Sequence, residues 1–187
     1  ANGIKTSTHP WYSVFGNHDA DDWTKSNMED FTKTFRHFLG PDYYSFDYSD
    51  YHFVILNSIR LIEKQEEWLR NDMYLLGQGK KLIFFQHYPP KPSQVEELKF
   101  FGVKAIISGH WHSNKITDHD GLMDINSPTF RFGGIDVSPA GFRIHEIKND
   151  KLSSIYKIGG QEHRLTITYP SPDLEIHDDH LHVASNT

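Results

Sequence analysis

The chain contains no cysteine, which excludes disulfides, thiolate metal sites and a cysteine nucleophile. It also lacks any apolar run near the ~18 residues that cross a bilayer, so we expect no association with a membrane. The 19 Lys and Arg residues, set against 25 Asp and Glu, form no concentrated basic stretch. We therefore expect no binding to bulk nucleic acid, whereas a small phosphate ester remains a possible partner.

Histidine, by contrast, is abundant. The 13 histidines do not form a terminal run, and their number is the first compositional sign of metal chemistry. A length of 187 residues with 37% hydrophobic content is enough for one buried core but too little for two large domains. We therefore expect one globular unit.

Short apolar runs alternate with segments of helical spacing, a pattern typical of an α/β protein. The apolar runs span residues 11–15, 51–56, 82–85 and 103–107. The helical stripes are Phe31, Phe35, Phe38 and Leu39, then Trp68, Leu69, Met73 and Leu76, which Gly77 closes as a C-cap. Ser93 and Glu96 predict a capping box for a further short helix that stops at Gly102.

The last third of the chain changes to a β pattern. Residues 142–147 and 152–158 alternate between apolar and polar around Asn149-Asp150, which predicts a hairpin. Beyond Gly159-Gly160 the sequence is polar, with no helix or strong strand pattern. We therefore divide the chain into residues 1–158 and a tail, residues 159–187, that is a linker or the start of a further domain.

Polar clusters stand where three of the apolar runs end. Asn17 and His18 follow the first run, His87 follows the third, and His110 and His112 follow the fourth. Ligand sites of α/β sheets form outside the carboxyl ends of the strands, so these clusters should converge. One amide oxygen and four imidazoles suit ions of the Zn, Fe, Mn or Co type.

Two glycines precede these clusters. We expect Gly16 and Gly109 to provide the sharp turns that bring the following side chains back over the sheet edge. His110 and His112 would point to opposite faces of an extended strand. A tight loop could instead direct them at two neighbouring ions.

The ordered set Gly-Asn-His-Asp (16–19), a lone His87 after an apolar strand, and Gly-His-Trp-His (109–112) resembles the last three motifs of calcineurin-like metallophosphoesterases. Residues 65–69 and 84–90 are also similar to members of this group, so the resemblance covers most of residues 11–158. It implies a partial four-layer αββα sandwich with a β-rich C-terminal part. Residues 1–158 would then be the C-terminal part of a phosphoesterase catalytic domain.

The resemblance also implies roles for the residues. Asn17, His87 and His110 would hold one metal ion, and His112 would contact the other. His18 would protonate the leaving group or contact the phosphate. A metal-bound hydroxide at the dinuclear centre would hydrolyse a phosphomonoester or phosphodiester, with two divalent or trivalent ions, Mn, Fe or Zn, as cofactors.

One departure from the family is substantial. The family's Asp-x-His and Gly-Asp-x-x-Asp-like motifs precede Gly-Asn-His, and residues 1–15 contain neither. We therefore expect this chain to be part of a longer enzyme, whose upstream part is a candidate partner. The alternative is a non-catalytic metal-binding or interaction fragment with an incomplete site. A bacterial secreted or periplasmic location is compatible with the absent cysteines.

Other polar residues have ordinary explanations. Asp19 is expected to cap a turn or orient His18 rather than bind metal. A second cluster, His177 to His182, contains Asp178-x-His180, but Pro170 and Pro172 nearby and the lack of an apolar strand favour a solvated tail. Trp111, Tyr44 and Phe46 are expected in the core or a pocket wall.

Overall fold

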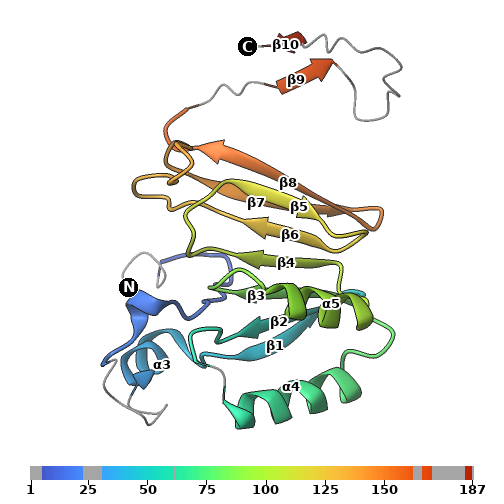
Figure 1. The fold of residues 1–187 in the computed structure, drawn as a ribbon. Coiled ribbons are helices and arrows are strands. Elements are labelled where there is room, and N and C mark those ends of the chain that lie inside the picture. Colours follow the sequence, from blue (N-terminus) through green and yellow to red (C-terminus); the bar gives the residue numbers. More distant parts are fainter. Residues whose placement is uncertain (1–5, 23–30, 61, 162–165, 170–183, 187) are drawn as a thin grey trace.

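The computed structural model describes residues 6–22, 31–60, 62–161, 166–169 and 184–186. Its main feature is a six-stranded sheet with the strand order β1-β2-β3-β4-β6-β5 (Figure 1). The strands are β1 (Tyr44–Tyr48), β2 (Tyr51–Leu56), β3 (Lys81–Gln86), β4 (Ala105–Ser108), β5 (Lys115–Asp118) and β6 (Met123–Asn126). The four central strands β2, β3, β4 and β6 run parallel, and the edge strands β1 and β5 are antiparallel to their neighbours.

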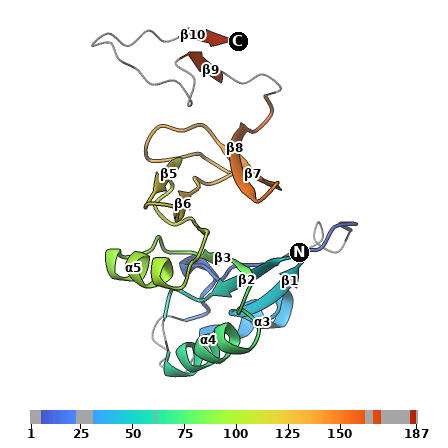
Figure 2. The same ribbon diagram turned by 90° about the vertical axis from the view of Figure 1, so that its right-hand side faces the viewer.

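One face of this sheet forms the main core under two helices. Val54, Phe84 and Ile106, from three adjacent strands, are buried on this face together with Leu98. Helices α4 (Glu63–Leu75) and α5 (Pro92–Phe100) cover it, and Figure 2 shows both on the same side of the sheet. Full burial of a side chain such as Phe84 contributes about 1.5–3 kcal/mol to the free energy of unfolding.

The predicted capping box of α5 is wrong. The helix begins at Pro92, its N-cap is Lys91, and no side chain caps its amide groups. Proline suits the first helical position, because its φ angle is fixed near the helical value and it has no N–H group to satisfy. Ser93 therefore lies inside the first turn rather than at the cap.

A hairpin lies over the opposite face of the sheet. It consists of β7 (Gly141–Lys148) and β8 (Lys151–Ile158), as the sequence predicted. Asn149 and Asp150, with φ of 49° and 63°, form its turn. Two-residue hairpin turns with positive φ at both positions favour Asn, Asp and Gly. A cavity of about 580 Å³ separates the hairpin from the sheet, with Phe85 and Ile107 on the sheet side and Leu152 on the hairpin side.

The observed layers can be compared with the predicted αββα sandwich. Helices α4 and α5, the main sheet and the hairpin supply one helical and two β layers of the expected partial αββα sandwich. The α/β class and the β-rich C-terminal part are thereby confirmed. Among the described residues, no helix is long and apolar enough to cross a membrane.

The segment before the Gly-Asn-His motif differs from the prediction. Residues 11–15 form no strand, because they pair with none of the described strands. Aromatic side-chain contacts fix this segment instead. Phe15 is buried against Phe35 of helix α3 (Lys33–Leu39) and against Phe31, which precedes that helix. Tyr12 stacks on Phe46 of β1 with 3.9 Å between ring centroids. The motif is therefore anchored by aromatic packing.

The tail contains two strands that the sequence did not predict. Strands β9 (Thr166–Tyr169) and β10 (Ala184–Asn186) pair antiparallel with each other, which corrects the expectation of a tail without strong strands. The cluster of residues 177–182 lies outside the described residues.

Candidate metal centre

The predicted site residues lie at one edge of the main sheet. Because β3 and β4 run parallel, the segments that follow them, which carry His87 and His110, emerge at the same edge. The short 3₁₀ helix η1 (Asn17–Asp19) brings Asn17 and His18 to the same place. In Figure 1, this edge is the one toward which the arrowheads of β4 and β6 point.

Three side chains meet in direct contact. The Nε2 atom of His87 is 2.6 Å from Oδ1 of Asn17 and 3.2 Å from Nδ1 of His110. Two ligands bound about 2.0–2.2 Å from one ion would lie roughly 3 Å apart, which is close to these separations. All three atoms carry lone pairs when each imidazole is neutral and its proton is on the other ring nitrogen, so a cation is a suitable partner for the trio.

The histidines of this trio favour the neutral form. Burial, followed by the charge of the neighbouring His110, lowers the pKa of His87 to about 4. Burial, followed by the charges of His112 and His18, also lowers the pKa of His110. Neutral imidazole is the form that binds metals, so the site needs no proton release from these rings near neutral pH.

The remaining two predicted residues lie beside the trio without touching it. His18 and His112 are close enough to influence the protonation of both His87 and His110. His18 is exposed, and the ring of His112 contacts Phe132 with centroids 5.2 Å apart. The structure therefore gathers all five predicted residues, with Asn17, His87 and His110 at the centre and His18 and His112 around them.

The loop that carries the last two histidines is tight and conformationally unusual. His110 and His112 both adopt left-handed backbone conformations, with φ of 61° and 46°. The N–H of Trp111 donates to the carbonyl of Gly109 at 2.7 Å, closing a very short turn between them. The expectation that Gly109 would make the sharp turn is wrong, because the left-handed positions are the histidines themselves. Such strain concentrates at functional sites.

Gly16 is needed for space rather than for a turn. Its backbone is extended, with φ −113° and ψ 168°, which any residue can adopt. A Cβ atom at Gly16 would lie 3.0 Å from Nδ1 of His87, so the glycine lets the imidazole approach the backbone. Asp19 accepts a hydrogen bond from the Gly16 N–H at 2.9 Å, which agrees with its predicted role in capping this turn.

The buried Asn126, which the sequence motifs did not indicate, forms hydrogen bonds to both ends of the loop that carries His110 and His112. Asn126, the last residue of β6, donates through Nδ2 to the hydroxyl of Ser108 at 3.0 Å and also to the carbonyl of Gly109. Its Oδ1 atom accepts from the hydroxyl of Ser113 at 2.8 Å. Asn126 thus fastens both ends of the loop, which fixes where His110 and His112 can lie.

A buried polar residue lies at or just after the end of each of the four parallel strands. These residues are Asn57 after β2, Gln86 at the end of β3, Ser108 at the end of β4 and Asn126 at the end of β6. Each bonds to the loop above it or to its neighbour, so the loops at this edge rest on a polar layer. Buried polar groups in native proteins are almost always satisfied in this way.

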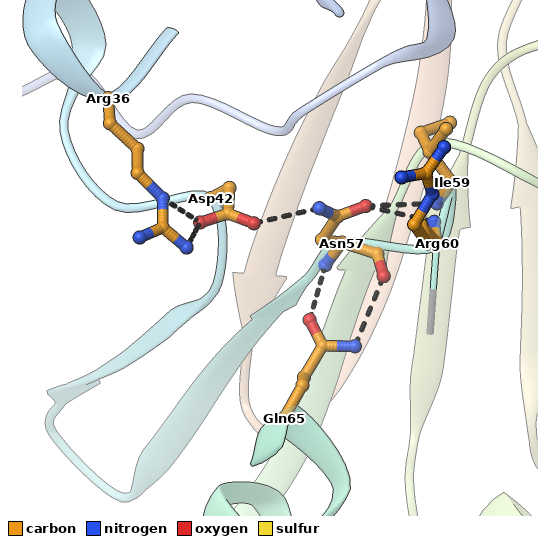
Figure 3. A network of polar contacts seen from close by, with 6 residues as sticks. All are labelled: Arg36, Asp42, Asn57, Ile59, Arg60 and Gln65. Carbon is orange, nitrogen blue, oxygen red and sulfur yellow. Dashed lines mark hydrogen bonds and ion pairs between the residues drawn. The ribbon is translucent and has the colours of Figure 1, made fainter. Parts of the chain in front are cut away.

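Figure 3 shows the part of this layer around Asn57. Its N–H donates to Oε1 of Gln65 at 3.0 Å, and its side-chain amide donates to Asp42 at 2.7 Å. Asp42 also accepts from Nε of Arg36 at 2.7 Å, while Oδ1 of Asn57 accepts from the N–H of Ile59 at 3.0 Å. The network ties α3, the end of β2 and α4 together beside the site.

Tyr88 is a second neighbour that the motifs did not identify. Its ring stands edge-on to that of His110, with centroids 4.2 Å apart and planes at 87°. The hydroxyl of Ser58 accepts a hydrogen bond from the Tyr88 N–H at 2.9 Å. Tyr88 therefore fixes the orientation of the His110 ring, and its position directly after His87 was the available signal.

The donor set fits one ion better than two. Asn17, His87 and His110 provide one amide oxygen and two neutral imidazoles, a combination suited to Zn, Mn or Fe ions. Within the described part of the chain, no group of three His, Cys, Asp or Glu residues is arranged to hold a metal ion, so Asn17 is essential to this set. His112 alone cannot hold a second ion.

Solved structures with similar folds include a purple acid phosphatase from yellow lupin (Lupinus luteus) seeds. It is 18% identical, with a TM-score of 0.43, over 63% of this chain and 30% of that one. GAP50, titled as the anchor in the inner membrane complex of Plasmodium, is 16% identical, with a TM-score of 0.47, over 63% of this chain and 50% of its own.

Among curated proteins, the chain is similar to Serine/threonine-protein phosphatase CPPED1. The zebrafish (Danio rerio) protein is 30% identical in a match that covers 60% of this chain and 45% of the relative. The human protein is 28% identical in a match that covers 79% of this chain and 55% of the relative. The chain spans about half the length of the curated relatives it matches.

Residues 1–114, more than half of the chain, match the calcineurin-like phosphoesterase family. The protein belongs to this family of hydrolases, which act on phosphate esters. The resemblance drawn from the three motifs is thereby confirmed.

Proposed function

We propose that the full-length protein is a metal-dependent phosphoesterase and that this chain supplies one side of its dinuclear centre. The observation that carries the proposal is the convergence of Asn17 Oδ1, His87 Nε2 and His110 Nδ1 at one point of the sheet edge. The family membership of the chain supports the same conclusion. The substrate would be a small phosphomonoester or phosphodiester.

In this proposal, Asn17, His87 and His110 hold one ion, and His112 contributes to the second. Bound ions of this kind polarise the phosphoryl group and neutralise the charge that develops on it. The remaining ligands of the second ion would come from parts of the full-length protein outside this chain, since the match covers only 45% of the zebrafish relative.

His18 would act on the leaving group. It is exposed beside the trio and shares its electrostatic environment, so it can reach a bound ester without occupying a ligand position. A protonated imidazole there donates its proton to the leaving oxygen as the ester bond breaks. Loss of a general acid typically lowers turnover by ~10²–10⁴-fold.

The test compares full-length wild-type protein with His18→Ala and with His37→Ala, which removes an exposed histidine of α3 that lies outside the candidate site. We expect His18→Ala to keep its metal content and to lose ~10²–10⁴-fold in kcat on an aryl phosphate or aryl phosphodiester. His37→Ala should match wild type.

Equal activity of His18→Ala and wild type would remove His18 from the mechanism. Absence of turnover in wild-type protein that contains its metals would instead favour the alternative, a binding or interaction protein with this fold. Comparison of the two esters would show whether the substrate is a monoester or a diester.

A further inference from the structure

The loop between β6 and β7, residues 127–140, exposes apolar side chains next to the candidate metal centre. The exposed fractions are 67% for Phe130, 66% for Phe132 and 79% for Ile135, and Trp111 in the histidine loop is 54% exposed. Single exposed apolar residues are common, but several gathered on one loop indicate a binding surface. Figure 1 shows the loop at the edge of the sheet where the centre lies.

This loop is held in one conformation by its own hydrogen bonds. Thr129 and Gly133 exchange two backbone hydrogen bonds, of 3.2 and 3.0 Å, and the N–H of Gly134 donates to the carbonyl of Ser138 at 2.8 Å. A Cβ atom on Gly133, which has φ of 83°, would lie 2.1 Å from that same carbonyl. The exposed side chains therefore project from a fixed scaffold.

The loop is also fastened to the histidine loop. The N–H of Ile135 donates to the carbonyl of His112 at 2.7 Å, and the carboxylate of Asp136 accepts from the N–H of Asn114 at 2.6 Å. The ring of Phe132 also contacts the ring of His112, with centroids 5.2 Å apart. The distance of the apolar side chains from the centre is thus set by the protein backbone.

We infer that this loop binds the organic part of the phosphate ester and selects esters that carry an apolar or aromatic group. The inference rests on the proposed function, because it requires a phosphate at the histidines. An ester bound there has its organic group beside His112, where Phe132 and Ile135 offer apolar surface. The guanidinium group of the exposed Arg131 adds positive charge that favours an anionic ligand.

The hydrogen bonding of the loop argues against a β-strand as the occupant. The N–H groups of Gly133, Gly134 and Ile135 are all engaged within the loop or with His112, so no free edge is offered for strand pairing. What the loop presents outward is side-chain surface, which suits a flat apolar group. Contacts of an aromatic ring with such a surface strengthen binding by about 3- to 10-fold.

The test measures binding of phenylphosphonate and methylphosphonate to the full-length protein by titration calorimetry. The two probes share the charged group that the centre would bind and differ in the apolar group that the loop would bind. The variants are Phe132→Ser, the conservative Phe132→Leu, and Phe100→Ser as a control, since Phe100 is 86% exposed on α5. Phe132 is exposed, so its replacement should leave the fold intact.

We expect Phe132→Ser to weaken phenylphosphonate binding by about 3- to 10-fold with methylphosphonate changed less than about twofold. Phe132→Leu should recover part of the loss, and Phe100→Ser should match wild type. Equal weakening of both probes, or of neither, would overturn the inference. If neither probe binds to wild type, the proposed phosphate site is contradicted, and so is the proposed function on which the inference depends.

Discussion

At the scale of single residues, the candidate centre depends on backbone conformations that only a well-supported loop can hold. His110 and His112 both have positive φ, and each such position costs on the order of 1–3 kcal/mol in the folded state. The hydrogen bonds of Asn126 to both ends of the loop offset part of that cost. The proposed ligands are therefore positioned by Asn126, which is not itself a proposed ligand.

Gly16 and Gly109 offer a matched pair of substitutions. In Gly16→Ala the new Cβ would press on the His87 ring, whereas in Gly109→Ala the nearest atoms are 4.0 Å away. We expect Gly16→Ala to weaken metal affinity by about 10-fold or more, because sites of this kind tolerate displacements of only about 0.5 Å. Gly109→Ala should bind metal as wild type does. Equal affinities in competition with a chelator would contradict the proposed contact.

The convergence of the candidate ligand residues could be predicted from the sequence, but the residues that support them could not. Asn17, His87 and His110 stand in an ordered motif, each after an apolar run. Asn126 has no spacing relation to those motifs, and although Tyr88 directly follows His87, only the tertiary fold shows that it contacts the ring of His110. Residues that act through tertiary contacts leave little local signal in the sequence.

At the scale of elements, the hairpin β7–β8 carries a half-buried histidine, His145, outside the candidate centre. Burial lowers the pKa of His145, and the adjacent Arg143 lowers it further. Among the described residues, Nδ1 of His145 is one of the buried side-chain atoms that lack a hydrogen-bond partner. The imidazole faces the cavity between hairpin and sheet, where a positive charge is poorly solvated.

This burial has a defined effect on stability. The pKa of His145 is lower in the folded protein than in the unfolded chain, so below about pH 6.5 the unfolded chain binds the proton first. The contribution of His145 to the free energy of unfolding is therefore fully present above pH 6.5 and is lost as the pH falls.

We expect the variant His145→Leu to lose less stability than wild type between pH 7 and pH 5, measured by urea unfolding at each pH. The comparison with wild type isolates His145 from the other histidines. Identical pH slopes would mean that this side chain is solvated in both states.

Elements with strong local patterns were predicted, and those defined by their neighbours were not. The runs of β2 and β3 are mainly apolar, apart from the buried His52, because both faces of the sheet are covered, and exposure alternates along β8 of the hairpin. Strand β6, Met123–Asn126, is only four residues long and half polar, so its assignment depends on pairing with β4. Such tertiary context outweighs intrinsic β preference.

At the scale of the whole molecule, the sheet edge collects chemistry from distant parts of the chain. Residues 17, 87 and 110 meet because two parallel strands end together and an aromatic cluster around Phe15 anchors the preceding segment. In the proposed centre, this set would hold one metal ion, and His112 would be a lone contact for another. The central claim is that this trio is a metal site.

The measurement that tests this claim most directly is the metal content of the full-length protein, determined by elemental analysis for wild type, His110→Ala and the control His37→Ala. We predict two ions per chain in wild type and in His37→Ala, and loss of one ion in His110→Ala, because that change removes one of three proposed ligands. Two ions retained by His110→Ala, or no metal in wild type, would contradict the assignment of Asn17, His87 and His110.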